Sequence, residues 1–169
     1  MKSFLKSESI VCDVGCGQEG MLLVSIADHI KEGYGFDFNL KSDKHLKENI
    51  FLSKQDFVHC DKKFDVILLL AVIEHLRYPD SVETMLRAIF DKLNDRGIFI
   101  MTTPDKRAQW ILELLAYKLH LINEEEIRDH KHYFDKNELL ELMRKTGFHT
   151  TQHKHFQFGL NNLIVCCKE

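Results

Sequence analysis

The sequence lacks the features that mark several classes of protein. Of its 169 residues only two are proline and one is tryptophan, and no low-complexity segment or internal repeat is visible. No apolar run approaches the roughly 20 residues of a membrane span, and the opening MKSFLKSESI has no apolar core of a secretory signal. Lysine and arginine number 23 against 26 acidic residues, so no basic excess points to nucleic acid. We expect neither a membrane span nor a nucleic-acid partner.

The cysteines also give no sign of disulfides or of a zinc site. The five cysteines are an odd number and form no C-x-x-C pair, which argues against a disulfide framework or a zinc knuckle; they are Cys12, Cys16, Cys60, Cys166 and Cys167. We therefore expect a cytoplasmic protein whose thiols are reduced and packed as small apolar side chains.

What the sequence does contain is an alternation of strand and helix patterns, in a length and apolar fraction (44%) that suit a single domain over residues 1–169. The run FDVILLLAVI, residues 64–73, fits a strand buried on both faces of a parallel sheet. Residues 41–49 are predicted to form a short helix, and Asp80 with Glu83 and Asp135 with Glu138 have the spacing of capping boxes. The strands are predicted at residues 8–14, 34–38, 50–57, 64–73, 97–103, 148–156 and 162–167.

This pattern predicts an α/β fold, a doubly wound, Rossmann-like sheet of seven mostly parallel strands with an antiparallel C-terminal hairpin. In such sheets ligands bind beyond the carboxyl ends of the strands. Besides the glycine loop, Asp37, residues 70–75 and residues 102–104 fall at those ends.

The glycine loop in VCDVGCGQEGMLL, residues 11–23, has the G-x-G-x-x-G spacing of a dinucleotide-binding turn, but acidic residues accompany it. A pyrophosphate needs amide hydrogens and positive charge, whereas residues 11–28 hold no lysine, arginine or histidine and do hold Asp13 and Glu19. Carboxylates beside a pyrophosphate would repel it. S-adenosylmethionine carries a sulfonium and an ammonium and no phosphate, so the loop favours that cationic ligand.

A second carboxylate supports nucleoside binding. Asp37 ends the second predicted strand, 20 residues after Gly17, where it can accept hydrogen bonds from two ribose hydroxyls. Nicotinamide and S-adenosylmethionine enzymes both use such an acid, so Asp37 does not indicate which of the two cofactors binds.

With these motifs in order, the sequence resembles the class I S-adenosylmethionine-dependent methyltransferases of the small-molecule kind, which includes ubiquinone O-methyltransferases. The matching segments run through nearly the whole chain: VCDVGCG, YGFDFN, FDVILLLAVIEHL, LNDRGIFIMTTP and DHKHYFDKNELLELMRKTGF. The resemblance implies an S-adenosylmethionine site made by Asp13, Gly15, Cys16, Gly17, Asp37, Phe38, Leu70, Ala71 and Val72, with Asp56 as partner of the adenine amino group. It also implies a substrate-covering insert over residues 105–134. Because the first motif begins about ten residues from Met1, an extended N-terminal cap is not expected.

Two histidines are the candidates for chemistry. A hydroxyl acceptor must lose its proton as it attacks, and histidine suits that task near neutral pH. His75 follows the fourth motif beside the expected reactive methyl, and His130 begins a segment that in relatives folds near the same pocket.

A metal is not expected. Small-RNA 2′-O-methyltransferases bind a metal through E-x-x-E-H and a later histidine; Glu74, His75 and His130 match, but Ala71 replaces the first glutamate. Without that glutamate, one coordination position of the metal would have no protein ligand.

The sequence thus predicts a methyltransferase acting on a small molecule, most simply at oxygen, with S-adenosylhomocysteine as product. A cofactor-binding but inactive or regulatory relative remains an alternative, as does an NAD-dependent oxidoreductase. The apolar helix around Trp110 is compatible with substrate covering and with homodimer packing.

Overall fold

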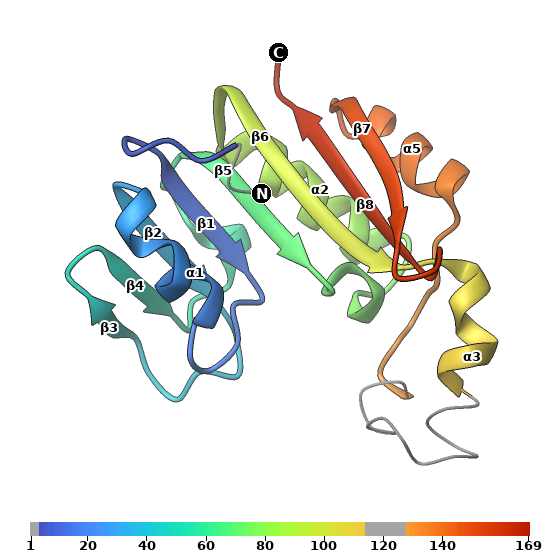
Figure 1. The fold of residues 1–169 in the computed structure, drawn as a ribbon, viewed down its shortest axis with the longest axis horizontal. Helices are drawn as coiled ribbons and strands as arrows, with labels where there is room; N and C mark the ends of the chain where they lie inside the picture. Colours follow the sequence, from blue (N-terminus) through green and yellow to red (C-terminus); the bar gives the residue numbers. More distant parts are fainter. Residues whose placement is uncertain (1–3, 114–127) are drawn as a thin grey trace.

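The computed structural model describes residues 4–113 and 128–169 and has an eight-stranded sheet with helices on both faces (Figure 1). Across the sheet the strands lie in the order β3-β4-β2-β1-β5-β6-β8-β7. Their bounds are β1 Ile10–Val14, β2 Glu32–Phe36, β3 Lys44–Lys47, β4 Ile50–Ser53, β5 Phe64–Leu70, β6 Leu93–Pro104, β7 His149–Phe156 and β8 Asn161–Cys167. The helices are α1 Met21–Ile26, α2 Asp80–Lys92, α3 Gln109–Glu113 and α5 Lys136–Lys145, with 3-10 turns η2 Ala27–His29, η3 Phe57–His59, η4 Ile73–His75 and η5 Lys106–Ala108.

The predicted fold class is confirmed. Strands β4, β2, β1, β5 and β6 pair in parallel, and β6-β8-β7 form the antiparallel hairpin edge. The sheet has one strand more than predicted, because residues 44–47 pair antiparallel to β4 instead of forming a helix. Leu46 in this segment packs against the apolar core beneath α1, and a strand lets it do so while the neighbouring lysines stay near solvent.

Two apolar layers separate the sheet from its helices. On one face α2 and α5 bury the stripes Val82, Leu86, Ile89 and Leu139, Leu142, Met143 against β1, β5 and β6. On the other face α1 buries Leu23 and Ile26 against alternate residues of the same strands. Since successive strand residues point to opposite faces, an unbroken apolar run such as β5 can serve both layers, and five of its seven residues are buried.

All five cysteines are free thiols, as expected. Within the described residues no helix is long and apolar enough to cross a membrane.

Candidate active site

The glycine loop leaves β1 at the carboxyl edge of the sheet and is fastened to the end of β2. The Gly15 amide donates to the Phe36 carbonyl at 2.7 Å, and the Gly17 amide donates to the Asp37 carboxylate at 2.9 Å. Gly15 has φ +80°, and a Cβ there would lie 2.4 Å from Val72 Cγ2. Only glycine combines this left-handed backbone with so close an approach, so the loop can bring its backbone against the start of η4.

A cavity of about 340 Å³ lies beside this loop. Five of the ten residues expected to bind the cofactor lie there: Gly15, Asp37, Phe38, Asp56 and Val72. The rest of the lining is Val14, Phe36, Lys54, Gln55, Phe57, Leu76 and Met85. The cavity thus combines an apolar wall from α2, η3 and η4 with two carboxylates, a composition typical of nucleoside-sized ligand sites.

Both carboxylates of the cavity are held by backbone amides. Asp37 also accepts from the Asn39 amide at 2.8 Å, and Asp56 accepts from the Val58 amide at 3.0 Å as it begins η3. Each carboxylate oxygen can accept more than one hydrogen bond. The two carboxylates are therefore held in place and can still accept hydrogen bonds from a ligand.

Asp13 is the buried charge of the site. At the end of β1 its side chain is 4% exposed, and within the described residues no hydrogen-bond donor reaches its carboxyl. Burial, and secondarily the proximity of Asp37, raises the pKa of Asp13 to about 7. An acid in this state gains most from a cationic partner, so it fits the ammonium and sulfonium of S-adenosylmethionine.

One part of the charge argument from the sequence is wrong. The Glu19 side chain is 72% exposed and pairs with Lys44 of the edge strand β3 at 3.9 Å, so it does not frame the cavity. The negative charge at the loop comes from Asp13 and Asp37 instead. The other five predicted cofactor residues do not line the cavity. Asp13 lies near the end of β1, Cys16 and Gly17 lie in the glycine loop, Leu70 ends β5 and Ala71 follows it.

The two candidate histidines, 55 positions apart, come together at the carboxyl end of β5. Their rings lie 4.8 Å apart, edge to face. His75 ends η4, between Val72 and Leu76, which both line the cavity. His75 Nδ1 lies 3.1 Å from Asp129 Oδ2, and His130 Nδ1 lies 2.9 Å from the Tyr133 hydroxyl.

Glu74 joins the elements that carry these rings. Its backbone carbonyl accepts from the Lys131 amide at 2.7 Å, and its carboxylate accepts from Thr103 Oγ1 of β6 at 3.0 Å. The side chain is 1% exposed, and burial raises the pKa of its carboxyl. Glu74 thereby fastens the segment 129–134 across the ends of β5 and β6.

Sequence reasoning missed Asp129 and Tyr133 as partners of the two histidines. Both lie within the DHKHYF segment, but no spacing rule indicates that Asp129 turns toward a residue 54 positions earlier. It also missed Leu76 and Met85 in the cavity wall, which read from the sequence only as apolar positions of a turn and a helix.

Glu74, His75 and His130 place potential metal-ligand atoms within 4.8 Å of one another. Each side chain also has a protein partner, namely Thr103, Asp129 and Tyr133 respectively. Position 71, where a further carboxylate would be needed, is an alanine with φ 54°. The expectation of a metal-free site stays a prediction.

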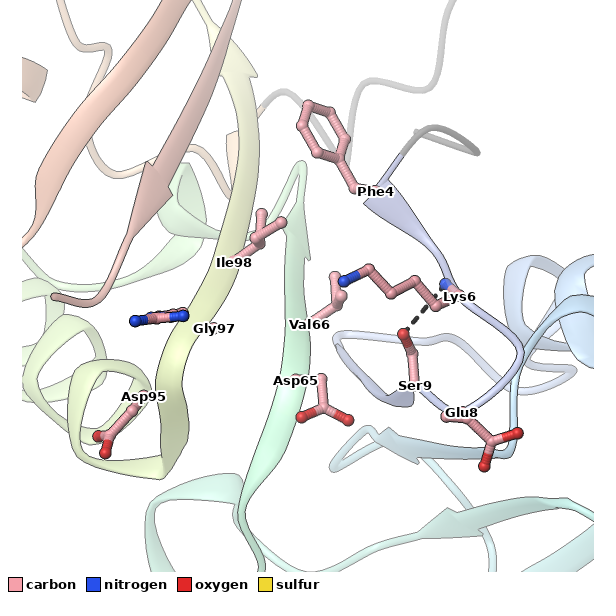
Figure 2. Close-up of a pocket in the computed structure, with 10 residues that line it drawn as sticks. Phe4, Lys6, Glu8, Ser9, Asp65, Val66, Asp95, Gly97 and Ile98 are labelled. Atoms are coloured by element: carbon pink, nitrogen blue, oxygen red, sulfur yellow. Dashed lines mark hydrogen bonds between the residues drawn. The ribbon is translucent and has the colours of Figure 1, made fainter.

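A second hollow of about 360 Å³ lies at the opposite, amino edge of the sheet (Figure 2). Phe4, Lys6 and Glu8 of the segment before β1 line it together with Asp65 of β5 and Asp95 of β6, and the Lys6 side chain extends toward Val66. The Asp65 carboxylate already has hydrogen-bond partners within the fold, since it accepts from the Ile10 amide and from Asn94. Ligands of doubly wound sheets bind at the carboxyl edge, so the glycine-loop cavity is the candidate active site.

A family model described as a methyltransferase domain matches residues 2–153. The chain belongs to this family. The S-adenosylmethionine-dependent methyltransferase class predicted from the motifs is thereby shown, and S-adenosylmethionine is its cofactor.

Individual relatives are distant. A ubiquinone biosynthesis O-methyltransferase of Rickettsia bellii is 22% identical over 171 residues, which cover 91% of this chain and 67% of the relative. Magnesium protoporphyrin IX methyltransferase of Synechocystis, crystallised with S-adenosylhomocysteine, superposes with a TM-score of 0.67 at 16% identity, over 96% of this chain and 75% of the other.

A protein of Bordetella parapertussis described as a possible exported protein superposes with a TM-score of 0.74 at 14% identity. That match covers 99% of this chain but 64% of the other, so the chain spans less than two thirds of that protein. Likenesses at such identities show the fold, and the methyl acceptor has to be argued from the site.

Proposed function

We propose that the chain transfers a methyl group from S-adenosylmethionine to a hydroxyl oxygen of a small molecule, with His75 as general base. The observation that carries this proposal is the His75–Asp129 pair, 3.1 Å long, beside the cavity and in edge contact with His130. The relative from Rickettsia is named an O-methyltransferase, which agrees with oxygen as the acceptor atom.

The residues of the cofactor cavity divide the binding task. Of the residues that line the cavity, Asp37 would accept hydrogen bonds from the ribose hydroxyls and Asp56 from the adenine amino group. Phe57, Leu76 and Met85 would contact the apolar faces of the cofactor. Asp13 balances the positive charge of the ligand. When bound, S-adenosylmethionine supplies a methyl group on a cationic sulfur, which is transferred to the acceptor oxygen.

The histidines handle the proton. With Nδ1–H donated to Asp129, the Nε2 atom of His75 carries a lone pair that takes the acceptor hydroxyl proton as the new C–O bond forms. Asp129 fixes this tautomer and stabilises the imidazolium that results. His130, held by Tyr133, positions the His75 ring through their edge contact.

The segments expected to cover the acceptor extend from residue 105 to residue 134. Residues 129–134 lie against Glu74, whereas residues 114–127 lie outside the described residues. Trp110 on α3 is 64% exposed, and its contact with an acceptor stays a prediction.

The test is a panel of acceptors that differ in the attacking atom. Formation of S-adenosylhomocysteine should be measured with phenols, sugar alcohols, carboxylic acids and amines of similar size. The proposal expects turnover with a hydroxyl acceptor, which His75→Ala lowers by about 10²–10⁴. Methylation of amines or carboxylic acids alone would contradict it. Binding of S-adenosylhomocysteine without turnover of any acceptor would favour a regulatory relative.

A further inference from the structure

The tip of the β7–β8 hairpin carries a fully exposed aromatic side chain. Residues 157–160 join Phe156 to Asn161, and the Phe158 side chain in this loop is 106% exposed. Gln157 and Phe158 both have left-handed backbone, with φ 49° and 58°. Such conformations are unfavourable for bulky residues. The Phe158 backbone is therefore strained, and its ring has no packing partner among the described residues that would compensate for the strain. Nothing in the fold accounts for a phenylalanine here.

The hairpin tip lies beside the end of β6 and the start of α3, at the carboxyl edge of the sheet (Figure 1). The Asp105 amide donates to the Leu160 carbonyl at 2.8 Å, and Arg107 of η5 donates to the Gly159 carbonyl at 3.4 Å. Trp110, three residues beyond Arg107, is 64% exposed, and Phe156 is 38% exposed. Three aromatic rings from two contacting segments are therefore open to the outside at one edge.

A cationic hollow of about 480 Å³ adjoins these rings. Its described lining is Asp105, Lys106, Arg107, Asp135, Lys136, Asn137 and His155. His155 and Phe156 are consecutive on β7, so the Phe156 ring points to the face opposite the hollow. The hollow meets the hairpin tip through Asp105 and Arg107, which are bonded to Leu160 and Gly159.

Both carboxylates of the hollow are already engaged. Asp105 accepts from Arg107 and Asn162 and pairs with His155, and Asp135 accepts from two amides at the start of α5. Among the described residues neither Lys106 nor Lys136 forms an ion pair. Their ammonium groups are free to attract an external anion.

We propose that this hairpin-tip surface, made by Phe158, Trp110, Lys106 and Lys136, docks on the surface of an anionic lipid bilayer. Protruding rings need an occupant that closes around them, and the headgroup layer does so without a matching groove. The lysines provide the charge complementarity, because each is attracted to anionic headgroups and the hollow between them has room for a phosphate.

The net charge of -3 does not oppose this docking. Salt screens charges beyond about 8 Å at physiological ionic strength, so the lysines nearest the lipid dominate the interaction. Docking in the headgroup layer requires no membrane-spanning helix. It is also independent of the methyl acceptor proposed above, although it would turn the carboxyl edge toward molecules dissolved in the lipid.

The test is co-sedimentation of the full chain with vesicles. One set contains phosphatidylcholine with one third phosphatidylserine, and the other contains phosphatidylcholine alone. The wild type should bind the first set, and weakly if at all the second. Phe158→Ser should lower the partition coefficient about tenfold, because a buried phenylalanine ring is lost. The double variant Lys106→Glu, Lys136→Glu should lower binding to anionic vesicles at least tenfold.

Two variants serve as matched controls. Met21→Ser removes an apolar side chain that is 74% exposed on α1, and Lys31→Glu reverses an exposed charge at the amino edge. Both should bind like the wild type. Because all of the changed side chains are exposed, unchanged melting temperatures verify that each variant is folded.

Three results would overturn the proposal. The first is absence of wild-type binding to anionic vesicles. The second is an equal loss of binding in the control variants. The third is a different occupant: either a dimer in sedimentation velocity that Phe158→Ser abolishes, or binding of inorganic phosphate that depends on Lys106 and Lys136, in each case without vesicle binding.

Discussion

At the scale of single residues, Asp13 is the group whose chemistry depends most on its surroundings. It is acidic, buried and without a hydrogen-bond donor among the described residues, and its pKa is raised to about 7. In the proposed binding mode, S-adenosylmethionine would bring cationic groups to the loop and so favour the ionised carboxylate. Cofactor binding and proton release from Asp13 would then be coupled.

The first prediction concerns this coupling. Below pH 7 the cofactor must displace a proton from Asp13, so its affinity should fall by nearly tenfold per pH unit between pH 7 and pH 5.5. Asp13→Asn should bind more weakly at pH 8 but with a flat profile over the same range. Calorimetric titrations at several pH values test this, and a wild-type profile as flat as that of the variant would contradict it.

The same group affects stability in the opposite sense. The folded state holds the Asp13 proton more tightly than the unfolded state, so this contribution to stability is present at low pH and is lost as pH rises toward 7. Asp13→Asn should therefore raise the free energy of unfolding at pH 8, by about 2–4 kcal/mol, and much less at pH 4. Urea unfolding of both proteins at the two pH values measures the difference.

The second prediction is metal independence. Glu74, His75 and His130 each have a protein partner, and Ala71 supplies no ligand. Exhaustive chelation should leave methyl transfer within about twofold of its initial rate. Loss of activity that Mg²⁺ or Mn²⁺ restores would show that the three clustered side chains hold a metal after all.

At the scale of elements, the active site depends on how η4 and the segment 129–134 are joined. Glu74 links them through its carbonyl and links β6 through its carboxylate. This joint holds the segment that carries Asp129 beside η4, which carries His75. In the proposed function the base lies on η4, whereas the carboxylates Asp37 and Asp56 that would hold the cofactor follow β2 and precede η3, so the two tasks should respond to different substitutions.

The third prediction separates these functions. Asp129→Asn should lower turnover about tenfold or more by weakening the orientation of His75, with the affinity for S-adenosylhomocysteine unchanged. His75→Ala should show a greater loss of the same kind. The matched control is Asp28→Asn, whose exposed carboxylate pairs with Lys47 and lies outside the lining of the cavity. Equal turnover in Asp129→Asn and wild type would mean that the carboxylate does not orient the base.

The secondary structure was predictable where local chemistry decides it. Asp135 and Glu138 form the capping box that their spacing predicts. Asp80 and Glu83 have the same spacing but form none, because Pro79 occupies the N-cap position and Asp80 is already the first residue of α2. Residues 44–47 became a strand because β4 offers an unpaired edge, which is a tertiary effect that no local pattern reports.

At the scale of the whole molecule, the order of strands gathers one functional edge. Strands β1, β2 and β5 end beside one another, so the glycine loop, Asp37 and η4 meet although they are far apart in sequence. Sequence patterns predicted these segments because topology alone places parallel strand ends together. They could not predict that Glu19 turns toward Lys44, or that Asp129 meets His75, because side-chain direction depends on packing.

The central claim is that S-adenosylmethionine binds in the cavity at this edge, with Asp37 holding its ribose. Calorimetric titration of S-adenosylhomocysteine tests it most directly. The account predicts saturable one-site binding to the wild type, weakened about ten- to a hundredfold in Asp37→Ala and unchanged in the double variant His75→Ala, His130→Ala. No binding to the wild type, or equal affinity in Asp37→Ala, would contradict the account.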